Sequence, residues 1–276
     1  TKDTIITLTA TGKPNAGSDQ TGACGGTSAT LTGTAPTTGT WSAQSANPVG
    51  ATLGSTVGGI ASVAFTANAS GVYNFIYSSS GCTDTMNITV NPKPNAGSDQ
   101  TNVCAGTSAT LTGTNPTTGT WTAQTGNPAG ATLGSTAGGI AAVAYATSSS
   151  GVYNFIYTAN GCSDTMNITV TAKPNAGIDQ TVNCFITGTA TMAGSGAGTW
   201  SFATGNAGTA TITTSNSATT TVTNFSTSGT YNLVWTNNGC SDTARITVNN
   251  SCACPITNNN LTAPVSPNCA PYNGTT

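Results

Sequence analysis

The chain has 276 residues and a formal net charge of −2, which comes from five Lys or Arg and seven acidic residues that are all Asp. Five cations are too few to neutralise a nucleic-acid backbone, and the absence of His excludes His-based catalysis and His-ligated metals. No apolar run approaches the ~20 residues that a transmembrane helix needs. Thr and Ser are abundant throughout while only 4% of the chain is charged, which favours β-sheet.

An internal repeat sets the domain organisation. The pentapeptide Lys-Pro-Asn-Ala-Gly begins at positions 13, 93 and 173, which are equally spaced. The segments 13–92 and 93–172 are identical at 59 of 80 positions. A third, more diverged copy at 173–250 keeps Trp200, Tyr231 and Cys240 in the same order. Recent duplication of one module suits an array better than an enzyme, so we expect no catalytic residues.

The two ends fall outside these three repeats. Residues 3–8 resemble residues 84–90, so 1–12 are predicted to be the last strand of a preceding repeat; alternatively, they donate a strand to another subunit. Residues 251–276 form a Cys- and Pro-rich tail or the start of a further module. The chain opens with no signal peptide, so we expect a processed or partial chain.

Within a repeat, short segments alternate in polarity with a period of two, which is typical of β-strands. In the first repeat they are residues 28–32, 39–43, 60–65, 72–77 and 86–90. Six or seven strands around a central Trp predict an all-β fold of tandem immunoglobulin-like antiparallel β-sandwiches forming a rod. The predicted core includes Trp41, Trp121 and Trp200 in the third strand, and Tyr73, Tyr153 and Tyr231 as tyrosine corners. An exposed carbohydrate platform is the alternative for the tryptophans.

The motifs Asn-Ala-Gly-Ser-Asp-Gln-Thr, Cys-Gly-Gly-Thr-Ser-Ala-Thr-Leu-Thr-Gly, Gly-Thr-Trp, Ser-Gly-Val-Tyr and Gly-Cys-Thr-Asp-Thr follow one another in the first repeat. This series resembles the polycystic-kidney-disease-type and gliding-adhesin-type immunoglobulin-like repeats of Bacteroidota surface proteins. The resemblance covers residues 13–250, and the third copy departs from it after Cys184. It implies a secreted, non-catalytic segment of a cell-surface fibre or adhesin stalk.

Two other functions remain open at this stage. The repeats themselves could bind a glycan or another cell. The threonines within 209–213 and 219–223 could form an ice-binding face. The expected partners are further copies of the same repeat, with glycan attachment, no nucleic acid and no cofactor.

The nine cysteines lie two to a repeat and outside Cys-x-x-Cys spacing, which indicates disulfides formed in an oxidising compartment. A local scheme pairs Cys24 with Cys82. A staggered scheme, slightly favoured by strand geometry, pairs Cys24 with Cys162 and Cys104 with Cys240. In it, Cys82 pairs with a preceding copy and Cys184 with a tail cysteine, and one thiol is left over for an intermolecular bond. The tail cysteines are Cys252, Cys254 and Cys269.

Asp-Thr followed by an apolar residue resembles the O-glycosylation signal of the same bacterial group. The candidate acceptors are Thr4, Thr85, Thr165 and Thr243. The alternative is that each Asp caps a turn. A further Asp per repeat, at positions 19, 99 and 179, gives too few oxygens for calcium; we expect each to bond its own backbone and predict no metal site.

Overall fold

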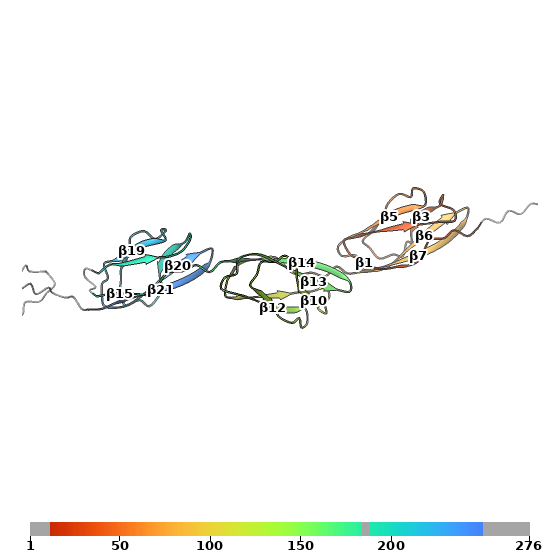
Figure 1. Cartoon of the computed structure of the whole chain (residues 1–276). Helices are drawn as coiled ribbons and strands as arrows, with labels where there is room; N and C mark the ends of the chain where they lie inside the picture. The colour runs from red at the N-terminus through yellow and green to blue at the C-terminus, as the bar shows by residue number, and fades with distance from the viewer. Residues whose placement is uncertain (1–11, 184–187, 251–276) are drawn as a thin grey trace, which may run out of the picture. The chain divides into compact units, whose positions relative to one another are not determined.

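The structure, a computed structural model, describes residues 12–183 and 188–250. The chain divides into two compact units. Among the described residues, one comprises 12–101, 108–145 and 152–169; the other comprises 102–107, 146–151, 170–183 and 188–250. All secondary structure in the described ranges is β (Figure 1), so no helix there could cross a membrane.

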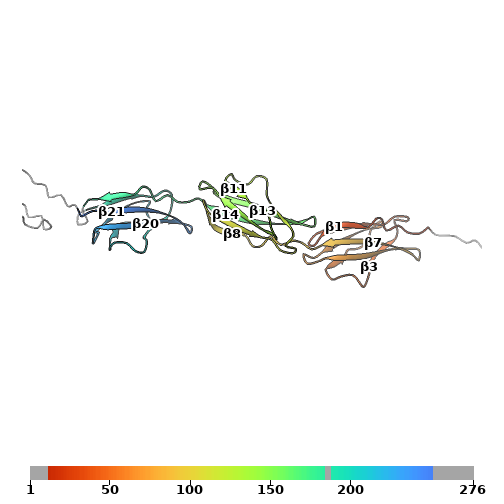
Figure 2. The same cartoon turned by 90° about the horizontal axis from the view of Figure 1, so that it is seen from below.

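The first repeat folds into two facing sheets. Strands β1, β7, β6 and β3 form one sheet in that order, and β2, β5 and β4 form the other. β1 runs parallel to β7, beside which Figure 2 shows it, and the other pairs are antiparallel. The strands are β1 (Gln20–Cys24), β2 (Ser28–Thr32), β3 (Thr40–Ala43), β4 (Ala51–Leu53), β5 (Ile60–Phe65), β6 (Gly71–Ser79) and β7 (Cys82–Asn91).

The second repeat has the same arrangement, with sheets in the orders β10-β13-β14-β8 and β11-β12-β9. The boundary between the two compact units runs through this repeat, because β8 and β14 each have residues in both. Its strands are β8 (Gln100–Cys104), β9 (Ser108–Thr112), β10 (Thr120–Ala123), β11 (Ala131–Leu133), β12 (Ile140–Tyr145), β13 (Gly151–Ala159) and β14 (Cys162–Thr171).

The third repeat has sheets in the orders β15-β21-β20-β17 and β16-β19-β18. Its first strand again pairs in parallel with its last. Its strands are β15 (Gln180–Val182), β16 (Ala190–Ala193), β17 (Thr199–Phe202), β18 (Thr211–Ile212), β19 (Thr219–Thr223), β20 (Gly229–Asn237) and β21 (Cys240–Val248). The departure predicted after Cys184, the strand predicted within 1–12 and the tail 251–276 fall on residues outside the described ranges, Gly12 excepted.

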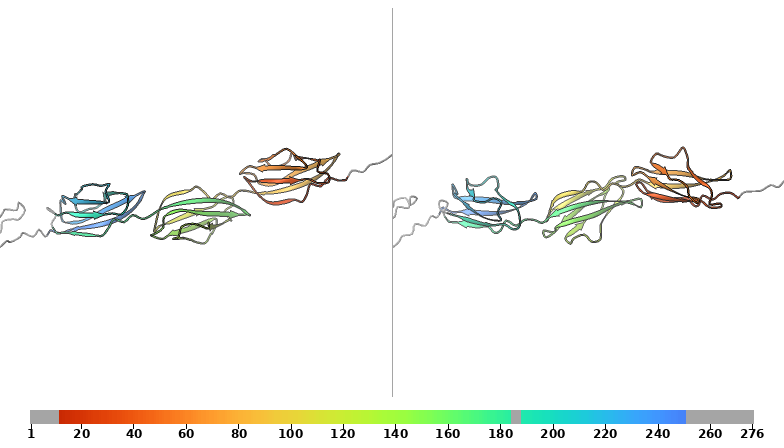
Figure 3. Two further views of the ribbon diagram at one scale, coloured as in Figure 1. Left: turned by 45° about the horizontal axis from the view of Figure 1, so that its top comes forward. Right: turned by 90° about the horizontal axis from the view of Figure 1, so that it is seen from above.

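Seven strands split into sheets of four and three define an immunoglobulin-like sandwich, and the two layers of each repeat are visible in Figure 3. Burial follows the sequence alternation: in Ile60–Phe65 every second side chain is buried and the others are exposed. A strand places successive side chains on opposite faces, so this alternation gives each sheet one apolar face for the core. The predicted class, all-β with tandem immunoglobulin-like sandwiches, is confirmed.

Each core contains a pair of large aromatic rings. In the first repeat Trp41 and Tyr77 have ring centroids 4.9 Å apart, and Trp121 and Tyr157 repeat this contact. A Cβ at Gly33 or Gly39 would overlap the Tyr77 ring, so glycine is required at both places. In the third repeat Trp235 takes the place of Tyr77 and packs on Trp200 at 4.9 Å.

The predicted tyrosine corner occurs in one repeat. Tyr231 donates a hydrogen bond to the Thr227 carbonyl, four residues upstream, as that motif requires. Tyr73 and Tyr153 instead donate to Val49 and Ala129 in the loop between the third and fourth strands. The prediction is therefore wrong for the first two repeats, because a nearby loop carbonyl takes the hydroxyl. All three tyrosines are buried.

Candidate functional site: disulfides between repeats and Lys–Asp clusters

Two disulfides link consecutive repeats. Cys24, the last residue of β1, is bonded to Cys162, the first residue of β14, with Cα atoms 5.7 Å apart. Cys104 is bonded to Cys240 in the same way, with Cα atoms 5.5 Å apart. Both distances are normal for disulfides. These are the pairs of the staggered scheme, and the local pair Cys24–Cys82 is not formed.

Strand direction explains the pairing. Because β1 runs parallel to β7, Cys24 lies opposite Asn91, the last residue of β7. Cys82 is the first residue of the same ten-residue strand, about 30 Å away at ~3.3 Å per residue. Cys24 is therefore out of reach of Cys82 but lies at the end from which the chain enters the next repeat.

A hydrogen bond accompanies the first disulfide. The side-chain Nδ2 of Asn91 donates to the carbonyl of Asn160 at 2.7 Å. Asn160 and Gly161 form the turn between β13 and β14, both with positive φ, and Cys162 follows them. Cys162 is buried, as is Cys240 in the second disulfide. The exit end of the first repeat thus contacts the hairpin of the second through one covalent and one polar bond.

Cys82 occupies the equivalent hairpin of the first repeat, where it is a half-buried free thiol. Ser80 and Gly81 precede it, again with positive φ. The remaining cysteines of the predicted set, Cys184, Cys252, Cys254 and Cys269, lie outside the described residues.

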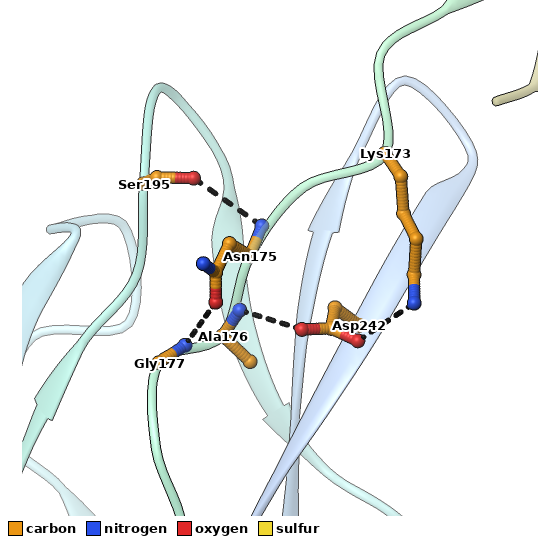
Figure 4. Close-up of polar contacts among 6 residues, drawn as sticks. All are labelled: Lys173, Asn175, Ala176, Gly177, Ser195 and Asp242. Carbon is orange, nitrogen blue, oxygen red and sulfur yellow. Dashed lines mark hydrogen bonds and ion pairs between the residues drawn. The ribbon is translucent and has the colours of Figure 1, made fainter. Parts of the chain in front are cut away.

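A second recurrent arrangement, which we call the Lys–Asp cluster, joins the first residues of each repeat to its last strand. In the third repeat Asp242 accepts a hydrogen bond from the Ala176 N–H at 2.9 Å and pairs with Lys173 at 3.1 Å (Figure 4). Asn175 accepts from the Gly177 N–H, and the Ser195 hydroxyl accepts from the Asn175 N–H. The same Lys and Asp contacts recur as Lys13–Asp84 and Lys93–Asp164.

These contacts correct the alternative that each Asp caps the hairpin turn. The carboxylate instead anchors the Lys-Pro-Asn-Ala-Gly segment, whose prolines, Pro14, Pro94 and Pro174, are buried. The Lys-Pro residues are therefore part of the fold and do not form a free linker. No local sequence pattern indicates this pairing, although the same Lys and Asp recur in all three copies at nearly constant spacing.

The Lys–Asp clusters lower the pKa values of their Asp residues. The hydrogen bond from Ala16, followed by Lys13, lowers the pKa of Asp84 below its ordinary 3.8. Burial raises the pKa of Asp164 and of Asp242, but the backbone hydrogen bond and the Lys together outweigh it, so both pKa values are also lowered. All three carboxylates are thus held as anions at neutral pH.

The other Asp of each repeat joins the first strand region to the last strand. Asp19 accepts from the Asn87 N–H, Asp99 from the Asn167 N–H, and Asp179 from the Arg245 N–H. Our expectation that each bonds its own backbone is therefore wrong, because the neighbouring strand supplies the donor. In the part of the chain that the structure describes, no group of three Cys, Asp or other ligating residues could hold a metal ion.

The remaining candidate residues lie in different environments. Thr85, Thr165 and Thr243 are exposed on the last strand of their repeats, and Thr4 is outside the described residues. Trp41, Trp121 and Trp200 are buried, so they do not form an exposed carbohydrate platform. In the threonine-rich sheet of the third repeat, the hydroxyls of Thr213 and Thr221 are hydrogen-bonded to each other at 2.7 Å.

No family model and no curated protein matches the sequence. Among solved structures, an I-band fragment of titin is 16% identical with a TM-score of 0.32, covering 86% of this chain and 96% of the fragment. The eight N-terminal Ig domains of Down Syndrome Cell Adhesion Molecule are 14% identical with a TM-score of 0.36, covering 86% and 36% of the two chains. These scores are low, so the fold assignment rests on the strand order alone.

Proposed function

We propose that this chain is a structural segment of an extracellular fibre or adhesin stalk at a cell surface, without catalytic activity. The observation that carries the proposal is the pair of disulfides that link consecutive repeats. Such bonds persist in oxidising, extracellular compartments. Cross-linking one repeat to the next has a clear use in a protein that transmits load along an array.

The low charge of the surface supports the same role. With 4% charged residues, neighbouring molecules repel one another weakly, which permits lateral and end-to-end association. The attachment of O-glycans to Thr85, Thr165 and Thr243 would keep such a surface hydrated. All three threonines are exposed, which supports this part of the proposal.

The test uses native material prepared from intact cells without reductant. We expect antibodies and added protease to reach the chain on intact cells, and negative-stain electron microscopy to show it in filaments or stalks. Cys24, Cys104, Cys162 and Cys240 should resist alkylation until a reductant is added. Recovery of the chain from the intracellular fraction with these four thiols reactive would contradict the proposal.

Glycan attachment has its own measurement. Mass spectrometry of native peptides should show glycan adducts on Thr85, Thr165 and Thr243, and Thr85→Val should remove the adduct at that position. Thr83→Val is the matched control, because Thr83 is exposed on the same strand but lacks a preceding Asp. Unmodified peptides at all three candidate threonines would contradict this part.

A further inference from the structure

We propose that the hairpin of the first repeat, Ser80–Cys82, is the docking site for the exit end of the third repeat of a second copy of this chain, closed by a disulfide at Cys82. This inference rests on the proposed function and adds the partner and the attachment point. It follows from comparing the same hairpin in the three repeats.

The hairpin has the same backbone geometry in each repeat, but the state of its cysteine differs. The two residues before the cysteine have φ of 50° and 75° in the first repeat, 51° and 78° in the second, and 46° and 79° in the third. Cys162 and Cys240 are 2% and 1% exposed and are bonded to a preceding repeat. Cys82 is a half-buried thiol. The position that is cross-linked in both other copies is therefore present in the first with the same backbone geometry, and there Cys82 is bonded to no other described residue.

The third repeat supplies a matching exit end. At the junction of the first two repeats, Asn91 follows the last core residue of β7 and donates to the Asn160 carbonyl. The corresponding residue after β21 is Asn249, which is exposed, whereas the second repeat has Thr171 there. On a second copy, Asn249 would meet the carbonyl of Ser80, the counterpart of Asn160.

The sequence also provides the second thiol. Cysteines stand five residues after Asp19 and Asp99, and Cys184 stands five residues after Asp179. The first two are the cysteines that bond the hairpin of the following repeat. The described disulfides thus leave over one hairpin cysteine, Cys82, and one cysteine whose position in the sequence matches that of Cys24 and Cys104, namely Cys184, which itself lies outside the described residues. Because the two surfaces differ, the contact is head-to-tail, and repeating it joins more than two chains in a ring or an open polymer.

The bond must be formed by oxidation. Two thiols lose two protons and two electrons and form one S–S bond, while a disulfide oxidant is reduced to two thiols. We name this oxidant by class as a small-molecule disulfide or a disulfide oxidoreductase; oxidised glutathione serves in the test.

The experiment mixes full-length chains labelled with ¹⁴N and ¹⁵N, both carrying native Cys24–Cys162 and Cys104–Cys240 bonds, in an oxidised and reduced glutathione buffer. Chymotrypsin cuts after Tyr77 and so separates Cys82 from Cys24. We expect the Cys82 peptide linked to the Cys184 peptide, with light–heavy pairs as frequent as chance dictates. Covalent species larger than a dimer should appear on non-reducing gels and disappear on reduction.

Cys82→Ser and Cys82→Ala should both fold, because this thiol is unbonded, and both should abolish the larger species. Cys254→Ser is the control and should leave them unchanged. The inference is overturned if Cys82 is recovered alkylated while multimers form through other cysteines, or if only light–light and heavy–heavy pairs occur. Native filaments with a free Cys82 would overturn this inference alone. An intracellular chain that still cross-links through Cys82 would overturn the proposed function alone.

Discussion

The first and third repeats fill the same core position in different ways. In the first, the Tyr77 hydroxyl accepts from the Gly39 N–H and donates to the Pro36 carbonyl. In the third, the indole N–H of Trp235 donates to the Ser195 carbonyl at 2.9 Å. The larger ring comes with a shorter loop, since five residues separate Gly33 from Gly39 but three separate Gly194 from Gly198.

This difference shows what the fold conserves. Both rings pack at 4.9 Å on the tryptophan of the third strand, and both have glycines against their edges. In both, the polar atom of the ring finds a partner in the loop between the second and third strands, as most buried polar groups do. Ring size and loop length change together, while the positions of the cysteines in the sequence and the Lys–Asp cluster stay fixed.

The largest expected effect is on the third repeat. Trp235→Ala removes a fully buried ring and should lower the stability of that repeat by about 3–5 kcal/mol. Hydrogen exchange of the amides in β16–β21 measures this repeat separately from the others. Val234→Ala, on the half-exposed face of the same strand, is the control with an expected loss under about 1 kcal/mol. Similar losses for the two variants would refute the placement of Trp235.

Tyr77→Phe tests the polar half of the comparison. It keeps the ring but leaves the buried Gly39 N–H without its acceptor, so the first repeat should lose about 1–3 kcal/mol. Tyr157→Phe should cost the same in the second repeat, because it removes the corresponding bonds to Gly119 and Pro116. Denaturant unfolding of each variant is the measurement. No loss in either repeat would mean that the hydroxyl is dispensable.

Acid sensitivity should be shared by all three repeats. Asp84, Asp164 and Asp242 have pKa values lowered below 3.8 in the folded chain. A lowered folded pKa gives stability that is present above about pH 4 and lost as the pH falls through the folded value. Unfolding free energy measured from pH 7 to pH 2 should therefore fall below pH 4. Asp242→Asn should flatten the decline in the third repeat only, and an unchanged decline would contradict the assignment.

The smallest expected effect concerns a difference between the cores of the first two repeats. Tyr145 in the second takes the place of Phe65, and its buried hydroxyl has no hydrogen-bond partner among the described residues. Burial, and then Tyr153, raises the pKa of Tyr145 to about 12. Tyr145→Phe should therefore stabilise the second repeat by about 1 kcal/mol, and Phe65→Tyr should destabilise the first by a similar amount. Thermal unfolding measures both, and a loss on Tyr145→Phe would indicate a partner for the hydroxyl.

The sequence alone was sufficient to predict the strands in which polar and apolar residues alternate strongly. Residues 28–32 and 60–65 were predicted as strands with the bounds that β2 and β5 have, because their polarity alternates without interruption. The three-residue strand β4 and the two-residue strand β18 could not be delimited, since so short a segment has no measurable period.

The contacts of the candidate site likewise divide into those that the sequence predicts and those that it does not. The staggered cysteine pairs could be argued from strand length and direction. The bond from Ala16 to Asp84, over 68 residues, could not. It depends on how the first residues of a repeat fold back against its last strand, which no local pattern encodes. For the same reason, the bond from Asn91 to Asn160 could not be predicted from either residue alone.

The two disulfides also set how far the chain can be stretched. They close loops that overlap, since each encloses the segment between Cys104 and Cys162. When the chain is pulled from its ends, the shortest covalent route from Cys24 to Cys240 crosses both disulfides and this shared segment. This route bypasses the rest of the backbone between Cys24 and Cys240. At ~3.5 Å per residue, the largest possible separation of Cys24 and Cys240 is about 200 Å, whereas the full backbone between them would span about 750 Å. Even with every sandwich unfolded, the two cysteines could separate by little more than a quarter of that backbone length, so the disulfides limit how far the chain extends under load.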